Sequence, residues 1–329
     1  MEKYLHRCLK SLIINDKDLF RRLEILIVND GSKDSSSQIA HGYEDKYPEV
    51  FKVIDKENGN YGSCVNYGLK EATGKYIKIL DADDYFDTSN LYQYLLYLSK
   101  NESDIFITDF NVVNLEGKKI REWRFKFPQK KELNVNDYCI TPSYKNLEMH
   151  AITYRTSLLV DNKYKQTEGI SYTDQEWMFI PMTYAKTFHY LSIPVYHYVL
   201  GREGQTMDPQ IKRKSIDQLE VILFRKLNVI SQSKIGEEIF QYLLSSFLSS
   251  ANYIYSTLLL INNIDKLKNI DYKIRVVNPQ IYILMNDIVY DRKFWPFKYV
   301  KYWRNNYFLI THILLKGYVV MMWIKGLVR

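Results

Sequence analysis

The chain has few cysteines and lacks the opening of a secretory signal. Its three cysteines, Cys8, Cys64 and Cys139, are far apart and odd in number. This excludes a disulfide framework, and the absence of a C-x-x-C pair gives no indication of a zinc site. The first ten residues mix polar and apolar side chains instead of placing a basic segment before an apolar one. The sequence therefore predicts a protein of a reducing, cytoplasmic compartment.

Most of the chain also lacks net charge. The whole formal charge of +7 is carried by residues 290–329, where eight basic side chains are opposed by Asp291 alone. The basic residues are Arg292, Lys293, Lys298, Lys301, Arg304, Lys316, Lys325 and Arg329. A basic terminal segment on a neutral body favours an anionic surface as its partner and does not indicate nucleic acid.

One short apolar run ends in a group of carboxylates. Residues 76–80 are followed directly by Asp81, Asp83 and Asp84. Carboxylates this close repel one another unless a cation or a proton offsets their charge. Mg²⁺ and Mn²⁺ take oxygen ligands and commonly link carboxylates to phosphates. We therefore expect a metal and phosphate site at this turn, the alternative being a solvated acidic turn.

The order of apolar patterns predicts an α/β fold, that is, a mostly parallel sheet flanked by helices. Strands are predicted at residues 23–28, 51–55, 76–80 and 104–110, and helices at residues 4–13, 35–47, 61–72 and 89–99. Asn29 and Asp30 follow the first of these strands, as Asp81 follows the third, so both acidic turns are expected at one edge of the sheet. From about residue 209 the pattern is helical only.

Four segments in this order resemble the family 2 glycosyltransferases, which have the GT-A fold. They are residues 24–35 (EILIVNDGSKDS), 57–62 (ENGNYG), 72–76 (ATGKY) and 81–84 (DADD), and a fifth element, residues 173–177 (TDQEW), resembles the motif that supplies the family's base. The resemblance implies an inverting enzyme that moves a sugar from a nucleotide diphosphate donor, with UDP-sugar as the default. It also implies a glycan or a polyprenyl-linked acceptor in bacterial surface polysaccharide assembly.

The resemblance assigns roles to particular residues. Asp30 would hold the nucleoside, Asp81 and Asp83 the metal (Mg²⁺ or Mn²⁺) and diphosphate, and Asp174 would accept the proton of the attacking hydroxyl; Gly59 and Gly62 would let the loop approach the donor. Asp174 and Glu176 lie about 200° apart on a helix, so only one can face the site, and the family motif favours Asp174. Arg202 either closes over the diphosphate or lies in a plain surface turn, and His150 and His197 are either metal ligands or structural histidines.

The chain departs from the family at its start. Members begin with an apolar strand central to the sheet, and here the first strand is missing because the opening helix begins at Met1. We expect its neighbours to expose unpaired backbone groups and apolar faces. The alternative function is therefore an N-terminally truncated, catalytically inactive member that retains a binding or scaffold role.

The sequence predicts three parts: a nucleotide-sugar-binding catalytic domain (1–208), a helical region (209–289) and a basic aromatic tail (290–329). The tail mixes aromatic and basic side chains as in-plane membrane helices do. Its basic face is expected to comprise Lys298, Lys301, Arg304, His312 and Lys316. We expect a cytoplasmic protein held peripherally on the inner face of the plasma membrane, the alternative being a tail packed on the catalytic domain.

Overall fold

The computed structural model describes residues 1–145, 147–202, 214–232, 234–287, 298–307, 309–311, 313, 315–317 and 320, with the side chains of 287, 298 and 299 excepted. The chain divides into two compact units, Met1–Glu203 and Gly204–Arg329. The division lies close to the expected boundary at residue 208, and the three-part domain organisation stays a prediction.

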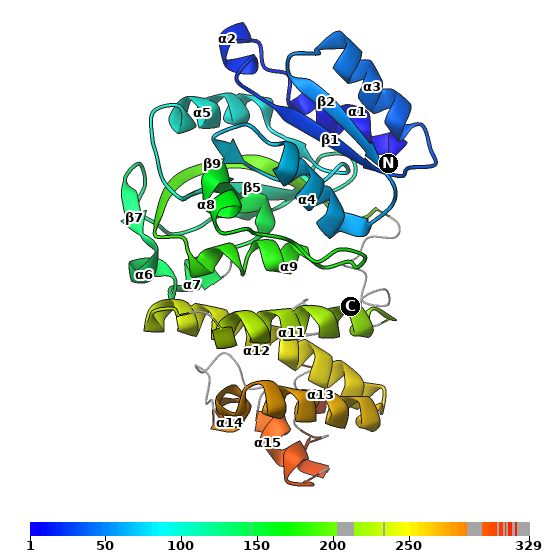
Figure 1. Ribbon diagram of the computed structural model, residues 1–329, viewed down its shortest axis with the longest axis vertical. Coiled ribbons are helices and arrows are strands. Elements are labelled where there is room, and N and C mark those ends of the chain that lie inside the picture. The colour runs from blue at the N-terminus through cyan, green and yellow to red at the C-terminus, as the bar shows by residue number, and fades with distance from the viewer. Residues whose placement is uncertain are drawn as a thin grey trace. The chain divides into compact units, whose positions relative to one another are not determined.

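Unit 1 contains a seven-stranded mixed sheet (Figure 1). Its strand order is β3 (Tyr76–Ile77), β8 (Ile152–Arg155), β5 (Ile105–Val113), β9 (Thr187–Val199) and β4 (Tyr85–Phe86), with β6 (Lys119–Trp123) on β5 and β7 (Glu132–Asn134) on β9. β5 and β9 pair in parallel, whereas the other pairs of this sheet are antiparallel. The predicted α/β class is confirmed, and the strand directions are more mixed than the sequence suggested.

A second sheet of two parallel strands is separate from the first. It pairs β1 (Ile25–Asp30) with β2 (Phe51–Lys56), and among the described residues neither strand joins the larger sheet. All six residues of β1 are only half-buried. The strand predicted at 76–80 is regular only over Tyr76–Ile77, which pair with Arg155 and Tyr154 of β8.

Helices and short turns of unit 1 surround the two sheets (Figure 1). They are α1 (Glu2–Ser11), α2 (Lys17–Phe20), α3 (Ser36–Lys46), α4 (Asn60–Glu71), α5 (Thr88–Leu98), α6 (Val135–Tyr138), α7 (Pro142–Lys145), α8 (Thr156–Asp161) and α9 (Asp174–Trp177), with 3-10 turns at Met149–Ala151 and Pro181–Thr183. α1 buries Leu5, Cys8 and Leu9, which recur at helical spacing. Asp87 caps α5 by accepting from the Asn90 amide at 2.8 Å.

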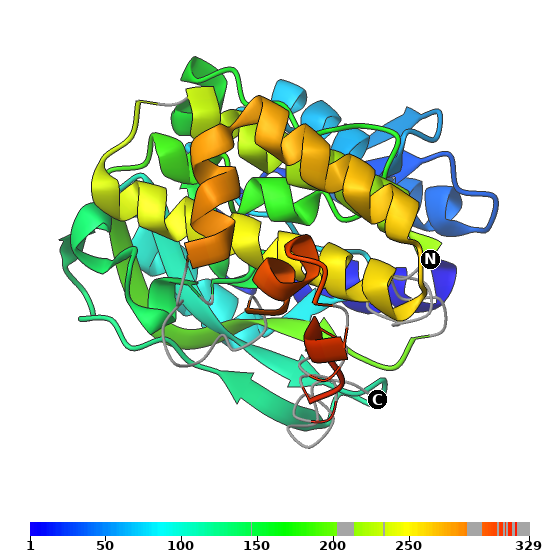
Figure 2. The same cartoon turned by 90° about the horizontal axis from the view of Figure 1, so that it is seen from below.

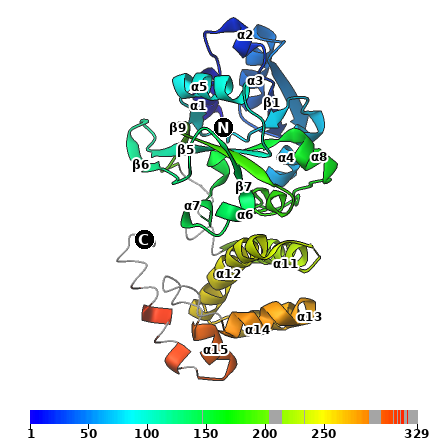
Figure 3. The same cartoon turned by 90° about the vertical axis from the view of Figure 1, so that its left-hand side faces the viewer.

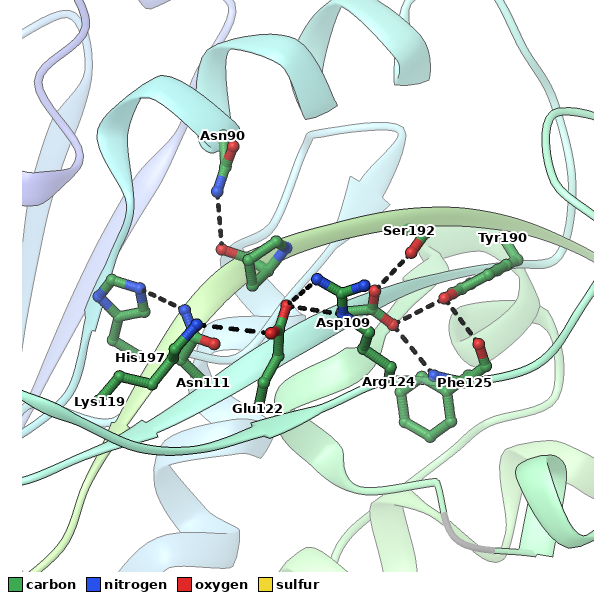
Figure 4. A network of polar contacts seen from close by, with 11 residues as sticks. Asn90, Asp109, Asn111, Lys119, Glu122, Arg124, Phe125, Tyr190, Ser192 and His197 are labelled. Atoms are coloured by element: carbon green, nitrogen blue, oxygen red, sulfur yellow. Dashed lines mark hydrogen bonds and ion pairs between the residues drawn. The ribbon is translucent and has the colours of Figure 1, made fainter.

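The core of unit 1 follows β5, all of whose residues are buried. Its register with β9 shifts on both sides of Asp109. The Asp109 carboxylate accepts hydrogen bonds from the Tyr190 hydroxyl (2.8 Å), the Ser192 hydroxyl (2.8 Å) and the Phe125 amide (3.1 Å) (Figure 4). Burial raises the pKa of Asp109, and these donors offset the cost of placing it where the strands are irregular.

Unit 2 is helical over its described residues (Figures 2 and 3). Its helices are α11 (Ile216–Gln232), α12 (Glu237–Leu260), α13 (Ile264–Val277), α14 (Pro279–Asp287) and α15 (Lys298–Arg304). Arg304 forms a buried ion pair with Asp271 at 2.5 Å, and Asp271 also accepts from the Tyr255 hydroxyl at 2.6 Å. The prediction that Arg304 belongs to a basic membrane face is wrong, because its charge is needed inside this unit.

The rest of the tail is described only in part. Leu309, Ile310 and Ile313 are exposed, whereas Thr311 and Leu315 are buried. Residues 288–297 and 321–329, and His312, lie outside the described residues. Among the residues that the structure describes, no helix has both the length and the apolar character to cross a membrane.

Candidate active site

The three carboxylates of the acidic turn each have different surroundings. Asp84 is buried and accepts from the Tyr196 hydroxyl at 2.6 Å and the Val199 amide at 2.7 Å. Asp83 accepts from the Arg202 Nε at 2.7 Å. The Asp81 amide donates to the Tyr196 hydroxyl at 3.2 Å. The turn is therefore fixed by groups from the end of β9 and the residues that follow it.

Burial and mutual repulsion disfavour ionisation of this turn. The pKa of Asp81 rises to about 7, chiefly through burial and then through the charges of Asp83 and Asp174. The pKa of Asp84 rises to about 8, through burial and the charge of Asp81. Asp174 therefore acts electrostatically on Asp81, although 93 residues separate them in the sequence. Raised pKa values of this kind are typical of sites that bind a cation or move a proton.

A possible third ligand, His150, lies beside two of these carboxylates. One ligand atom from each of Asp81, Asp84 and His150 lies within 4.8 Å of the other two. Burial, and then the charge of Lys78, lower the pKa of His150 to about 3, and its Nδ1 is buried with no hydrogen-bond partner. A neutral imidazole beside carboxylates suits a divalent cation.

The other two residues considered as ligands have different neighbours. Asp83, predicted to share the metal with Asp81, forms its ion pair with Arg202. His197 contacts the Asn111 side chain at 3.1 Å and packs edge-on against Tyr85. Its Nδ1 is buried without a partner, but the cluster of possible ligands found among the described residues does not contain it.

Asp30 lies at the end of β1 and forms an ion pair with Lys56 at the end of β2. It also accepts from the Gly59 amide at 2.9 Å. Lys56 in turn donates to the Ser63 hydroxyl at 2.7 Å. Lys56 was not predicted from the sequence: the parallel pairing of β1 with β2 brings it opposite Asp30.

Asp174 and Glu176 begin α9 and have different environments, as their helical spacing predicts. Glu176 is fully buried and accepts from the Thr167 amide at 2.8 Å and the Thr167 hydroxyl at 2.6 Å. Asp174 is half-buried and contributes to the raised pKa values of Asp81 and Tyr61. This geometry supports Asp174 over Glu176 as the residue that faces the acidic turn.

The glycines of the 57–62 segment approach the chain's own atoms. A Cβ at Gly62 would lie 1.8 Å from the Thr167 carbonyl oxygen, and one at Gly59 would lie 2.6 Å from the Ser63 hydroxyl. The sequence analysis assigned both close approaches to the donor. At Gly62 the structure gives a different reason, because α4 packs directly on the loop that leads to Asp174.

Comparisons with known proteins relate the chain to a family of glycosyltransferases. Residues 1–152 match the family model described as Glycosyl transferase family 2. The chain is 35% identical over 118 residues (36% of this chain) to the minor teichoic acid biosynthesis protein GgaB of Bacillus subtilis. It is 28% identical over 208 residues (63% of this chain) to the poly(ribitol-phosphate) beta-N-acetylglucosaminyltransferase TarS of Staphylococcus aureus. These matches cover 13% of GgaB and 35% of TarS.

Among solved structures, the chain is similar to residues 1–349 of S. aureus TarS in complex with UDP-GlcNAc. The TM-score is 0.69 at 22% sequence identity, and the match covers 96% of this chain and 88% of that one. A TarS structure without a named ligand gives a TM-score of 0.67 at 20% identity. The two proteins therefore share the GT-A fold.

Proposed function

From the premise that residues 1–152 belong to glycosyltransferase family 2, we propose that this protein transfers a sugar from a nucleotide diphosphate donor to an acceptor hydroxyl, with inversion at the anomeric carbon. The observation that supports this proposal most directly is that, besides burial, the charges of both Asp83 and Asp174 raise the pKa of Asp81. It supports a single site that combines the carboxylate turn at Asp81 and Asp83 with the acidic start of α9 at Asp174. These are the two groups that sugar transfer needs.

The proposed donor is a UDP-sugar, with its nucleoside held by Asp30. Support comes from the TarS structures, which are described in complex with UDP-GlcNAc and with UDP. Gly59 and Lys56 fix the Asp30 side chain through its Oδ1, so it is oriented before a donor binds. Arg202, bonded to Asp83, is the proposed cation for the diphosphate.

Asp81 and Asp83 are proposed to hold Mg²⁺ or Mn²⁺, with Asp84 and His150 close enough to complete the site. Such a cation neutralises charge on the departing diphosphate. Asp174 accepts the proton of the acceptor hydroxyl while the hydroxyl oxygen attacks the anomeric carbon and the bond to UDP breaks. Glu176 does not take this role, because Thr167 already occupies its carboxylate.

The proposed acceptor is a glycan or a polyprenyl-linked glycan of the bacterial surface, at the cytoplasmic side of the membrane. The names of the GgaB and TarS relatives, which refer to teichoic acid and poly(ribitol phosphate), support a phosphate-containing polymer. The exposed apolar side chains of Leu309, Ile310 and Ile313 and the basic tail support peripheral attachment to an anionic membrane.

Release of UDP tests the function. The full chain is incubated with UDP-GlcNAc and Mn²⁺, with and without an acceptor polymer, and compared with Asp174→Asn and with an EDTA-treated sample. We expect turnover by the unmodified chain only, with transferred sugar detected by mass spectrometry. Equal UDP release by Asp174→Asn would overturn the assignment of the base.

One observation favours a second candidate, a family member that binds without turnover. β1 and β2 form no pair with the larger sheet among the described residues, and Asp30 lies on this separate pair. The release assay together with a calorimetric titration of UDP decides between the two, because such a protein would bind UDP and release none from UDP-GlcNAc.

A further inference from the structure

A groove of about 1110 Å³ lies in unit 1, away from the residues of the candidate active site. Its walls are α1, α3 and the segment from β4 to the start of α5, with His197 of β9. None of the residues assigned to donor, metal or proton transfer lines it. The volume exceeds the roughly 300–1,000 Å³ of a typical small-ligand site, so it has room for several units of a chain.

The groove is predominantly cationic. Arg7, Lys10 and Lys46 line it, against one carboxylate, Asp87, whose oxygen is already used to cap α5. Lys10 and Lys46 are exposed, and within the described parts of the chain neither forms an ion pair. Their positive charge is therefore directed to solvent, where it would attract an anion.

Aromatic rings alternate with these cations. Tyr43 and Tyr47 come from α3 and its C-cap, and Tyr85 from β4. The Arg7 guanidinium lies 4.6 Å from the centre of the Tyr85 ring and donates to the Leu115 carbonyl at 2.9 Å, which fixes the side chain. The Lys46 Nζ lies 5.3 Å from the Tyr47 ring. Tyrosine faces provide apolar contact area for a ligand, and the Tyr43 hydroxyl is held by the His6 carbonyl, to which it donates at 3.3 Å.

We propose that this groove binds an anionic, polyol-phosphate glycan, with Lys10 and Lys46 contacting phosphates and the tyrosine rings packing on the carbon chain between them. The inference rests on the proposed function and names the part of the protein that holds the acceptor polymer outside the site of chemistry. Tyr85 follows Asp83 by two positions, so about 7 Å of chain connects the two regions. A polymer in the groove is thus held close to the transfer site.

Binding to poly(ribitol phosphate) tests the proposal, by calorimetry or by mobility in an affinity gel. Lys10→Gln with Lys46→Gln should weaken binding by about three- to tenfold, because two exposed ion pairs are lost. Added salt should reduce the difference. A charge reversal, Lys10→Glu with Lys46→Glu, should weaken binding further. Both lysines are exposed, and thermal melting checks that the variants fold.

A matched control uses exposed lysines elsewhere on unit 1. Lys70 lies in the last turn of α4, as Lys10 and Lys46 lie in the last turns of α1 and α3, and Lys100 follows α5. Lys70→Gln with Lys100→Gln should bind the polymer as the unmodified chain does. Equal losses in both double variants, or equal binding of single-stranded DNA at the same salt, would overturn the proposal.

Failure of the proposed function gives a different result. UDP release from UDP-GlcNAc in the absence of polymer should be the same in the groove variants and the unmodified chain. Loss of polymer binding with intact UDP release supports the groove. If no protein releases UDP, the proposed function fails, while the binding comparison still decides whether the groove holds the polymer.

Discussion

The acidic turn and the cationic groove are adjacent along the chain, at Asp84 and Tyr85, yet they hold their charges in opposite ways. Asp84 is buried and doubly hydrogen-bonded, and the pKa values of Asp81 and Asp84 are raised. Lys10 and Lys46 in the groove are exposed and unpaired among the described residues. Buried charges are organised before a ligand arrives and are costly to alter, whereas exposed charges act as a sum and are screened by salt.

The largest effect on the rate of sugar transfer should come from a change at Asp174, which acts on the acidic turn. Asp174→Asn keeps the side-chain volume but removes the proton acceptor, so transfer should fall by about two to four decades. Glu176→Gln is the matched control: it should lower the melting temperature, because it weakens the bonds to Thr167. Steady-state rates and thermal melts separate the two. A larger loss of rate in Glu176→Gln than in Asp174→Asn would show that Glu176, and not Asp174, is the base.

Asp83→Ala should act on binding. We expect it to weaken Mn²⁺-dependent UDP binding at least about tenfold, or about 1.4 kcal/mol, while the protein stays folded, because crowded carboxylates rarely stabilise a fold. Calorimetric titration with UDP, with and without Mn²⁺, measures this. If the variant binds UDP as tightly as the unmodified chain with the metal present, Asp83 has no part in the metal or diphosphate site.

Gly62→Ala tests how closely α4 packs on the loop that leads to Asp174. The added methyl group meets the Thr167 carbonyl at 1.8 Å, so the variant should lose about 1–3 kcal/mol of unfolding free energy. Gly68→Ala in the same helix is the control: its nearest neighbour would be Val28 at 3.9 Å. That change should be neutral or stabilise by up to about 1 kcal/mol. Urea unfolding of both variants gives the comparison.

The smallest effect on stability is expected at His41, whose exposed ion pairs link α3 to β2. His41 contacts Glu44 and Asp55, each at 2.8 Å, and these contacts raise its pKa above 6.5. Its contribution to stability should be fully present below pH 6.5 and be lost as the pH rises through the folded-state pKa.

The pKa values of the two carboxylates are lowered, mainly by the Asn29 side chain at Asp55 and by the Val53 amide at Glu44. Their contributions are lost as the pH falls through those values. The melting temperature of the unmodified chain, minus that of His41→Gln, should therefore be largest in the mildly acidic range. A difference independent of pH would show that the histidine charge has no role.

The elements and the first acidic residues were predictable because local patterns determine them. Apolar runs gave β1, β2 and β5, and the family motif together with helical spacing gave Asp174. Lys56 and the partners of the acidic turn required the tertiary structure, because Tyr196, Val199 and Arg202 lie more than 110 residues from the aspartates that they bond. The sequence named His150 and His197 as alternatives, and only the structure brings His150 beside Asp81 and Asp84. The prediction for Arg304 was wrong because a helical wheel does not reveal that Asp271 lies opposite it.

The bonds of the acidic turn also have a consequence during protein synthesis. Asp84 and Asp83 find their partners 112 to 119 residues further along the chain. Until the ribosome has released the whole of β9 and Arg202, nothing neutralises these carboxylates, and contacts this distant form slowly. The nascent chain therefore carries its acidic turn without these hydrogen bonds while the rest of unit 1 is made. The bonds that fix the acidic turn are therefore among the last to form in unit 1, and a translation product interrupted before Tyr196 lacks all three.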